Sequence, residues 1–110
     1  MAEIYMDNAA GTRVLPDVLD AMMPYLTSQY GNPSSIHTFG NAPRAAVERA
    51  RGQVAALIGA APAEITFTSC GSESNNLALK GTAWANEKKG RHIVVSAIEH
   101  QSVLHAAKAL

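Results

Sequence analysis

Hydrophobic positions in the first quarter of the chain recur at the spacing of an amphipathic helix. Pro16 stands where the first turn of a helix tolerates proline, and Pro24 is expected to kink or end the helix. The pattern therefore predicts a helix from about Pro16, preceded by an arm or edge strand at Met1–Tyr5. The apolar positions of this helix are Leu15, Val18, Leu19, Met22, Met23 and Leu26.

A second apolar stripe follows a segment rich in turn-forming residues. Gly31–Asn41, with the sequence GNPSSIHTFGN, predicts a long ordered loop. Asn41 can cap a helix that carries Pro43 in its first turn, and Gly59 is expected to end that helix. The stripe consists of Ala46, Val47, Ala50, Val54, Leu57 and Ile58.

The second half of the chain alternates between short apolar runs and helical patterns. Glu64–Thr68 and His92–Ser96 predict two strands, the second buried on both faces because nearly every residue is apolar. A helix is expected at about Glu73–Glu87, and another from Ser102 towards Leu110. This order predicts an α/β fold with parallel strands.

Two strands do not make a stable parallel sheet, which needs cover on both faces and neighbours on both edges. The final helical pattern also reaches Leu110 without a stop signal. We therefore expect the 110 residues to be a fragment of a longer natural protein.

Composition limits the classes of function. Hydrophobic residues make up 47% and charged residues 16%, which is typical of a soluble globular protein. Nine basic residues balance nine acidic ones, so the sequence offers no basic field for nucleic acid. No apolar stretch has membrane-spanning length, no secretory signal is present, and Cys70 has no partner for an internal disulfide. These features favour a cytoplasmic protein with neither nucleic-acid nor membrane partners.

The segment from Thr68 to Asn75 joins a predicted strand to the start of a helix. Ligands bind at this edge of open α/β sheets, and helix N-termini favour anions such as phosphate. Gly71 allows close backbone approach, and the hydroxyls of Ser69, Ser72 and Ser74 could donate hydrogen bonds. The alternative is an ordinary capping box that stabilises the helix.

His100 follows the second predicted strand, so its loop is expected beside the Thr68–Asn75 loop. The imidazole could stack on a flat ring or move a proton, or it could only cap and pack locally. The offset between His100 and His105 does not suit two ligands on one helical face, so we expect no metal site. Cys70 is read as a buried structural thiol in preference to a reactive one, and Asn8 as a residue of a local turn.

Four segments resemble one enzyme family and keep its order. IYMDNAAGTRV is similar to its opening Y-x-D-N-A-A-T-T, and GNPSSIHTFG to its G-N-P-S-S-x-H-x-F-G loop. Glu64–Asn76 resembles E-I-x-F-T-S-G-x-T-E-S-x-N, and HIVVSAIEHQSVL resembles H-I-x-x-S-x-x-E-H-x-A-V-L. The chain thus resembles the N-terminal part of cysteine desulfurases of the NifS/IscS type, in the class-V aminotransferase superfamily.

The resemblance implies a partial type I fold of enzymes that use pyridoxal 5'-phosphate (PLP). Residues 1–15 are expected to form an N-terminal arm or small-domain segment, and residues 16–110 the truncated start of the PLP-binding large domain. The family is homodimeric and converts L-cysteine to L-alanine, leaving an enzyme persulfide. Its sulfur goes to iron–sulfur scaffolds or to other acceptor proteins.

The resemblance also assigns roles to individual residues. Gly71 and Ser72 correspond to residues that hold the PLP phosphate. His100 corresponds to the catalytic histidine that stacks on the pyridine ring and moves protons, and Asn8 falls in a segment that borders the substrate pocket. Phe39 and the GNPSS loop are expected to shape the mouth of the site and the dimer contact.

The chain departs from the family pattern at a few positions. Gly11 stands where the family has threonine, and this weakens any role for that position. Cys70 replaces a common glycine, Ser72 replaces threonine but keeps the hydroxyl, and Asn75 replaces a common aspartate.

The family's Schiff-base lysine and persulfide cysteine lie far downstream in the resemblance. Cys70 and the lysines at positions 80, 88, 89 and 108 do not correspond to them. The isolated chain is therefore expected to be inactive. Two alternatives remain: another class-V enzyme such as a selenocysteine lyase, or a non-catalytic fragment or binding module. The sequence does not distinguish nitrogen-fixation supply from housekeeping sulfur supply.

Overall fold

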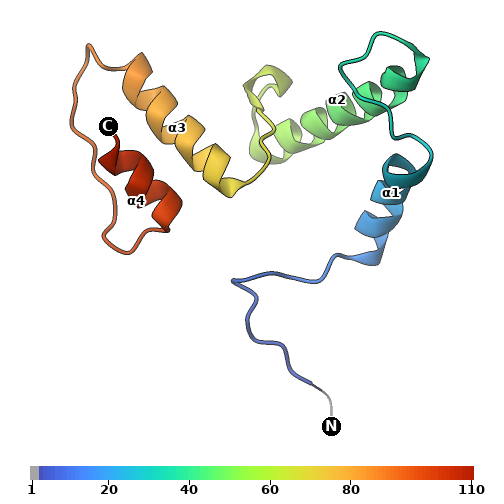
Figure 1. Ribbon diagram of the computed structural model, residues 1–110, viewed down its shortest axis with the longest axis horizontal. Coiled ribbons are helices and arrows are strands. Elements are labelled where there is room, and N and C mark those ends of the chain that lie inside the picture. Colours follow the sequence, from blue (N-terminus) through green and yellow to red (C-terminus); the bar gives the residue numbers. More distant parts are fainter. Residues whose placement is uncertain (1–2) are drawn as a thin grey trace. The chain divides into compact units, whose positions relative to one another are not determined.

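The computed structural model describes residues 3–110 and is helical (Figure 1). The described elements are α1 (Pro16–Thr27), α2 (Thr38–Ile58), the 3-10 helix η1 (Pro62–Glu64), α3 (Gly71–Ala85) and α4 (Gln101–Lys108). They belong to two units, Met1–Ile65 and Thr66–Leu110.

Helix α1 confirms the predicted start at Pro16 but does not end at Pro24. The helix continues to Thr27, because Pro24 lies close enough to the C-terminus for its missing N–H to cost only one helical hydrogen bond. The carbonyl of Pro24 accepts hydrogen bonds from the N–H groups of Ser28, at 3.0 Å, and Gln29, at 2.8 Å. These two bonds satisfy the Pro24 carbonyl, one of the four that the end of the helix leaves without an intrahelical partner.

Helix α2 begins earlier than the predicted cap at Asn41. Its N-cap is His37, which is extended, and the N–H of Gly40 donates to the His37 carbonyl at 2.9 Å. Pro43 therefore lies inside the helix and has no N–H to donate to the carbonyl of Phe39. Gly59 ends the helix with a φ of 68°, as predicted, because glycine adopts the left-handed region without strain.

The predicted ordered loop precedes α2 and is closed by one arginine. Arg44 donates from Nε to the carbonyl of Pro33 at 2.9 Å and from Nη2 to the carbonyl of Ser35 at 2.7 Å. Asn32 holds the same turn, since its Oδ1 accepts from the N–H of Ser34 at 2.8 Å. The loop is thus fixed by hydrogen bonds to its own backbone.

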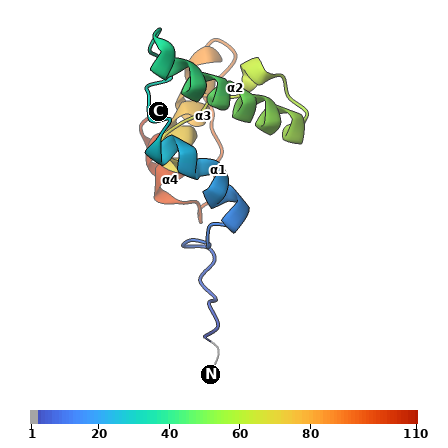
Figure 2. The same cartoon turned by 90° about the vertical axis from the view of Figure 1, so that its right-hand side faces the viewer.

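At its other end, α2 contacts η1, which folds back against it (Figure 2). Arg51 donates from Nη1 to the carbonyl of Ile65 and also pairs with Glu48. Ala55, on the same helix, is 1% exposed. These contacts hold the end of the first unit together.

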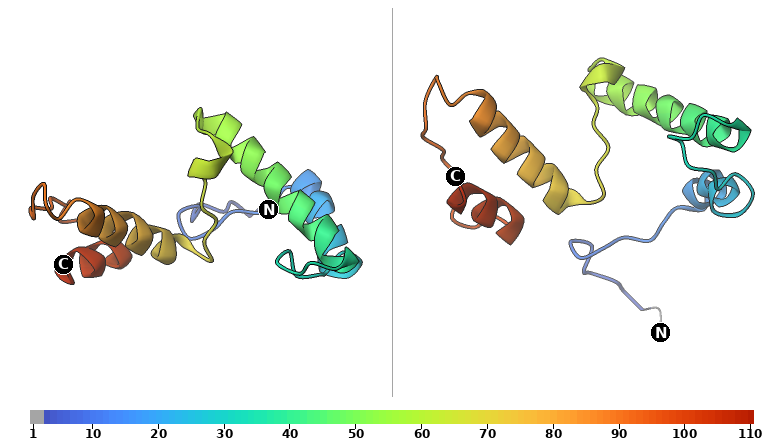
Figure 3. Two further views of the ribbon diagram at one scale, coloured as in Figure 1. Left: turned by 90° about the horizontal axis from the view of Figure 1, so that it is seen from above. Right: turned by 45° about the horizontal axis from the view of Figure 1, so that its top comes forward.

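In the second unit, α3 and α4 lie side by side (Figures 1 and 3). Ala106 of α4 is 2% exposed, and its small side chain allows this close packing. Helix α3 begins two residues before the predicted Glu73, and α4 one residue before the predicted Ser102. Helix α4 ends at Lys108, so the expectation that it runs through Leu110 is wrong.

The predicted strands are the main local error. Neither Glu64–Thr68 nor His92–Ser96 is a strand, and no strand occurs anywhere in residues 3–110. Met1–Tyr5 lies partly outside the described residues, and Glu3–Tyr5 is not a strand. Val94 is 82% exposed and not buried on both faces. The backbone of a strand needs ladder partners, and the described residues pair no two extended segments.

Candidate functional site

The N-terminus of α3 carries the predicted phosphate-binding residues Gly71 and Ser72 in its first turn. Its N-cap is Cys70, whose backbone is extended and whose side chain makes no capping hydrogen bond. Glu73 reaches back instead to Ser69, accepting from its N–H at 2.6 Å and from its hydroxyl at 2.6 Å. Both bonds lower the pKa of Glu73, the hydroxyl bond most. This contact resembles the capping-box alternative but leaves the first N–H groups of α3 uncapped.

Those first-turn N–H groups affect the titration of the neighbouring Cys70 thiol. The pKa of the Cys70 thiol is lowered, chiefly by the backbone N–H of Glu73, then by the Ser69 hydroxyl and the N–H of Ser72. Cys70 is exposed, so its interpretation as a buried thiol is wrong. The reason is its place at the N-cap, outside the packed surface between α3 and α4. A bound anion would meet the same N–H groups, and phosphate binding at this turn stays a prediction.

His100 is the N-cap of α4, and the local role expected as one alternative is confirmed. Its Nδ1 accepts from the N–H of Ser102 at 3.1 Å and lies 2.8 Å from the Ser102 hydroxyl. The Ser102 hydroxyl also accepts from Nδ2 of Asn75 on α3 at 2.8 Å. A ligand role for His100 remains a prediction.

Ser72 and His100 line one hollow between α3 and α4, with a volume of about 360 Å³. The two loops that were expected side by side thus bring a phosphate-binding candidate and a catalytic candidate to one surface. The remaining lining is mostly polar, and includes one lysine and a second histidine. The other lining residues are Asn76, Lys80, Gln101, Ser102, His105 and Ala106.

Asn8 lies in the first unit, in a turn where the N–H of Ala10 donates to the Asp7 carbonyl at 3.0 Å. The hydroxyl of Tyr5 bonds the same carbonyl at 2.8 Å. The predicted local turn is therefore confirmed, and the place of Asn8 beside a substrate remains a prediction.

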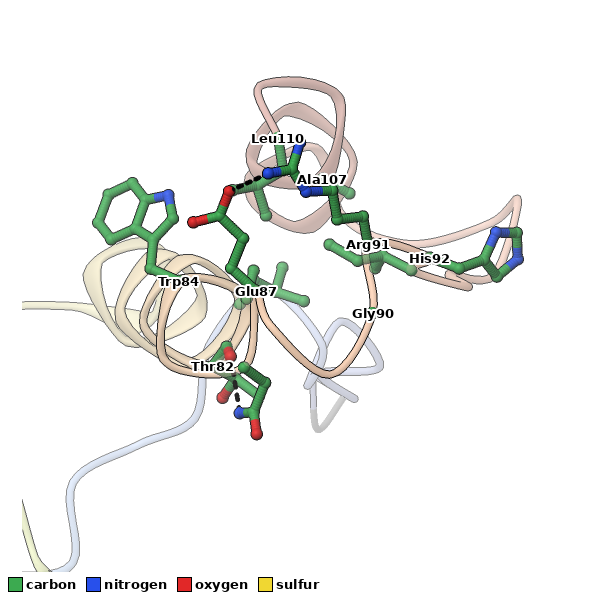
Figure 4. Close-up of a pocket in the computed structure, with 12 residues that line it drawn as sticks. Thr82, Trp84, Glu87, Gly90, Arg91, His92, Ala107 and Leu110 are labelled. Carbon is green, nitrogen blue, oxygen red and sulfur yellow. Dashed lines mark hydrogen bonds and ion pairs between the residues drawn. The ribbon is translucent and has the colours of Figure 1, made fainter.

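A larger pocket, which the sequence did not indicate, lies at the other end of α3 (Figure 4). Its volume is about 720 Å³, and its lining includes Trp84 of α3, Glu87 just after that helix, and Ala107 and Leu110. Glu87 pairs with Arg91 on its rim. Among its lining residues, only Trp84 stands out in the sequence, as a large aromatic residue of the predicted helix. In the structure its side chain is 67% exposed. The pocket contains none of the predicted site residues.

Within residues 3–110, no three His, Cys, Asp or Glu side chains are grouped closely enough to hold a metal ion. The described helices also include none with the length and hydropathy needed to cross a membrane.

Comparison with known proteins settles the family. Residues 4–110 match the family described as aminotransferase class-V. The chain belongs to this family. A solved structure titled "NIFS-LIKE PROTEIN" matches this class-V chain with a TM-score of 0.83 and 43% identity, covering 93% of the chain and 28% of that structure. The match confirms the type I fold, although residues 3–110 form helices of that fold and none of its strands.

The curated relatives of this class-V chain are cysteine desulfurases. One from Nostoc sp. is 54% identical over all 110 residues, and these make up 27% of its length. One from Dictyoglomus turgidum, named cysteine desulfurase IscS, is 52% identical over 102 residues, 93% of the chain and 26% of the relative. The chain therefore spans about a quarter of the length of these relatives.

Proposed function

We propose that this chain is the part of a PLP-dependent cysteine desulfurase that holds the cofactor phosphate and presents a catalytic histidine. The observation that carries the proposal is the hollow shared by Ser72 and His100, in a chain 54% identical to a cysteine desulfurase. The reaction converts L-cysteine to L-alanine and transfers its sulfur to a cysteine thiol of the enzyme, which becomes a persulfide.

The residues at the start of α3 fit a phosphate group. The N–H groups of the first turn have no side-chain cap, and they already lower the pKa of a neighbouring thiol. Gly71 has no atom within 4 Å of the position that a Cβ would take, so the backbone is open to a ligand. The Ser72 hydroxyl adds a donor on the same turn. Gly71 and Ser72 would hold the phosphate together.

His100 would stand beside the ring of the cofactor. When bound, PLP supplies the electron sink for the chemistry at the substrate. The contribution of His100 is to stack against the ring and to hold or move a proton near the substrate, from a ring kept in place by Ser102. Asn8 would border the substrate L-cysteine.

The remaining features of the proposal concern the whole protein. We infer a cytoplasmic homodimer that passes sulfur to an iron–sulfur scaffold or another acceptor protein. Residues 1–15 would form an arm and residues 16–110 the start of the large domain. Support comes from the class-V family and from the relative named IscS.

The test uses the full-length protein loaded with PLP and supplied with L-cysteine and a thiol reductant. We expect stoichiometric alanine and sulfide, and no alanine from residues 1–110 alone. Absence of alanine from the full-length protein would refute the proposal. Faster turnover of L-selenocysteine than of L-cysteine would favour a selenocysteine lyase instead.

Alkylation of Cys70 provides a separate test of the phosphate site. Because the pKa of Cys70 is lowered, iodoacetamide should modify it at lower pH than an ordinary thiol, as thiolate forms there. Inorganic phosphate bound at the same N–H groups should raise that pKa and slow the reaction several-fold at neutral pH. The extent of modification is measured by mass spectrometry of the peptide that contains Cys70, with chloride at equal ionic strength as control. Equal rates in phosphate and chloride would contradict phosphate binding at α3.

A further inference from the structure

A chain of three hydrogen-bonded side chains crosses from α3 to the start of α4. Nδ2 of Asn75 donates to Oγ of Ser102 at 2.8 Å, and Oγ of Ser102 lies 2.8 Å from Nδ1 of His100. Asn75 and Ser102 are both partly buried, whereas His100 is exposed. This series of hydrogen bonds therefore begins at partly buried side chains and ends at the His100 ring, which lines the hollow.

One backbone group determines which atoms donate and which accept along these three side chains. The N–H of Ser102 points to Nδ1 of His100 at 3.1 Å, and a backbone N–H can only donate. Nδ1 must therefore be an acceptor and carry no proton in the neutral ring. The Ser102 hydroxyl, which accepts from Asn75, is then free to donate its own proton to Nδ1. In this arrangement each of these donors meets an acceptor.

We propose that Asn75 and Ser102 are positioning residues that hold neutral His100 as the tautomer with its proton on Nε2. Which nitrogen of a histidine is protonated follows from the hydrogen bond that the other nitrogen makes. Here the other nitrogen receives two hydrogen bonds, one from the backbone and one from a hydroxyl that Asn75 orients. No proton is transferred in this step.

This assignment defines what His100 offers to a ligand, and that consequence rests on the proposed function. With Nδ1 occupied by the cap, Nε2–H is the group left for a molecule in the hollow. Neutral His100 therefore acts there as a hydrogen-bond donor. To accept a proton at Nε2, the ring must first lose its proton from that atom or give up its bonds to Ser102. Lys80 and His105 also line the hollow, but neither takes part in the chain of bonds.

The decisive variant is Asn75→Asp, which keeps the shape of the side chain and removes its donor. The carboxylate would attract the proton of the Ser102 hydroxyl, whose oxygen would then face Nδ1 as an acceptor. We expect the population ratio of the Nε2–H to the Nδ1–H tautomer to fall about tenfold. Asn86→Asp is the matched control, because it makes the same change at the C-cap of the same helix, where the amide donates to the Thr82 carbonyl, and it should leave the ratio unchanged.

The measurement is NMR of the full-length protein with 15N-labelled histidine, at alkaline pH and without PLP. The His100 signals are those lost in His100→Gln, and the shifts of the two ring nitrogens distinguish the tautomers. Wild type in the Nε2–H form, with a shift only in Asn75→Asp, is the expected result. An Nδ1–H ring in wild type, or equal ratios in the Asn75→Asp and Asn86→Asp variants, would overturn the proposal.

A second readout separates this inference from the proposed function. PLP binding is followed by its absorbance in the same variants. If the tautomer shifts as expected but PLP does not bind wild type, the positioning role stands and the desulfurase function fails. If PLP binds but the tautomer is insensitive to Asn75, the function stands and the positioning role fails.

Discussion

Replacing His100 with alanine should lower kcat of the full-length, PLP-loaded protein by at least about a hundredfold. Side chains that position or transfer a proton commonly contribute about 10²- to 10⁴-fold to rate. His100 shares the hollow with Ser72, so its loss would remove that group from the proposed cofactor site. Ser72 and the backbone of α3 stay in place, so PLP should still bind. Alanine release and the PLP absorbance spectrum measure the two effects.

Two further substitutions define the role of the ring. His92→Ala is the control, because His92 lines the larger pocket and not the hollow, and kcat should change less than about twofold. The variant His100→Gln keeps an N–H donor but cannot titrate, so partial recovery of kcat would indicate that donation from Nε2 matters. A kcat of His100→Ala close to that of wild type would contradict the catalytic assignment.

The second large effect is expected at Gly40, where α2 meets the ordered loop. A Cβ there would lie 2.3 Å from the carbonyl oxygen of Ser35 and 2.8 Å from that of Asn32. Both are backbone atoms, and Arg44 holds the Ser35 carbonyl. Gly40→Ala must therefore displace the loop, and we expect it to lower the free energy of unfolding by about 2 kcal/mol.

Gly52→Ala is the matched control on the same helix. Nothing lies within 4 Å of its added Cβ, so alanine should stabilise α2 by about 0.5 to 1 kcal/mol through its higher helix propensity. Urea unfolding of the full-length protein, followed by circular dichroism, measures both changes. If Gly40→Ala is as stabilising as Gly52→Ala, the close approach of the loop to α2 is wrong.

The sequence predicted helices where a local signal fixes a boundary. Pro16 and Gly59 act through their own backbone preferences, so the start of α1 and the end of α2 could be read directly. The start of α2 could not, because His37 caps it without a side-chain hydrogen bond. Pro43 and Asn41 gave a stronger signal that was misleading.

Strands depend on residues that a local pattern does not contain. Val94 and its neighbours have strand composition, but a strand forms only where another segment supplies a ladder. The type I fold was nonetheless predicted, because motif order carries information that hydrophobic spacing lacks. The match to the NifS-like structure confirms it at the level of the whole family fold.

The sequence predicted residues of the candidate site but not the hydrogen bonds that join them. Ser72 and His100 were identified from their places after apolar runs, and they share one hollow. Asn75 was noted only as a departure from the family pattern, and Ser102 only as the start of a helix. Their bond joins residues far apart in sequence, so only the packing of α3 on α4 reveals it.

The hydrogen bonds of Arg44 also have a kinetic consequence. They span only eleven and nine residues, to Pro33 and Ser35. Loops of this length close within about 10 to 100 ns, and the entropy lost on closure is small. The loop and the first turn of α2 can therefore form as soon as Arg44 has left the ribosome. Pairing of distant strands is slower. The GNPSS segment would thus be among the first ordered features of the nascent chain.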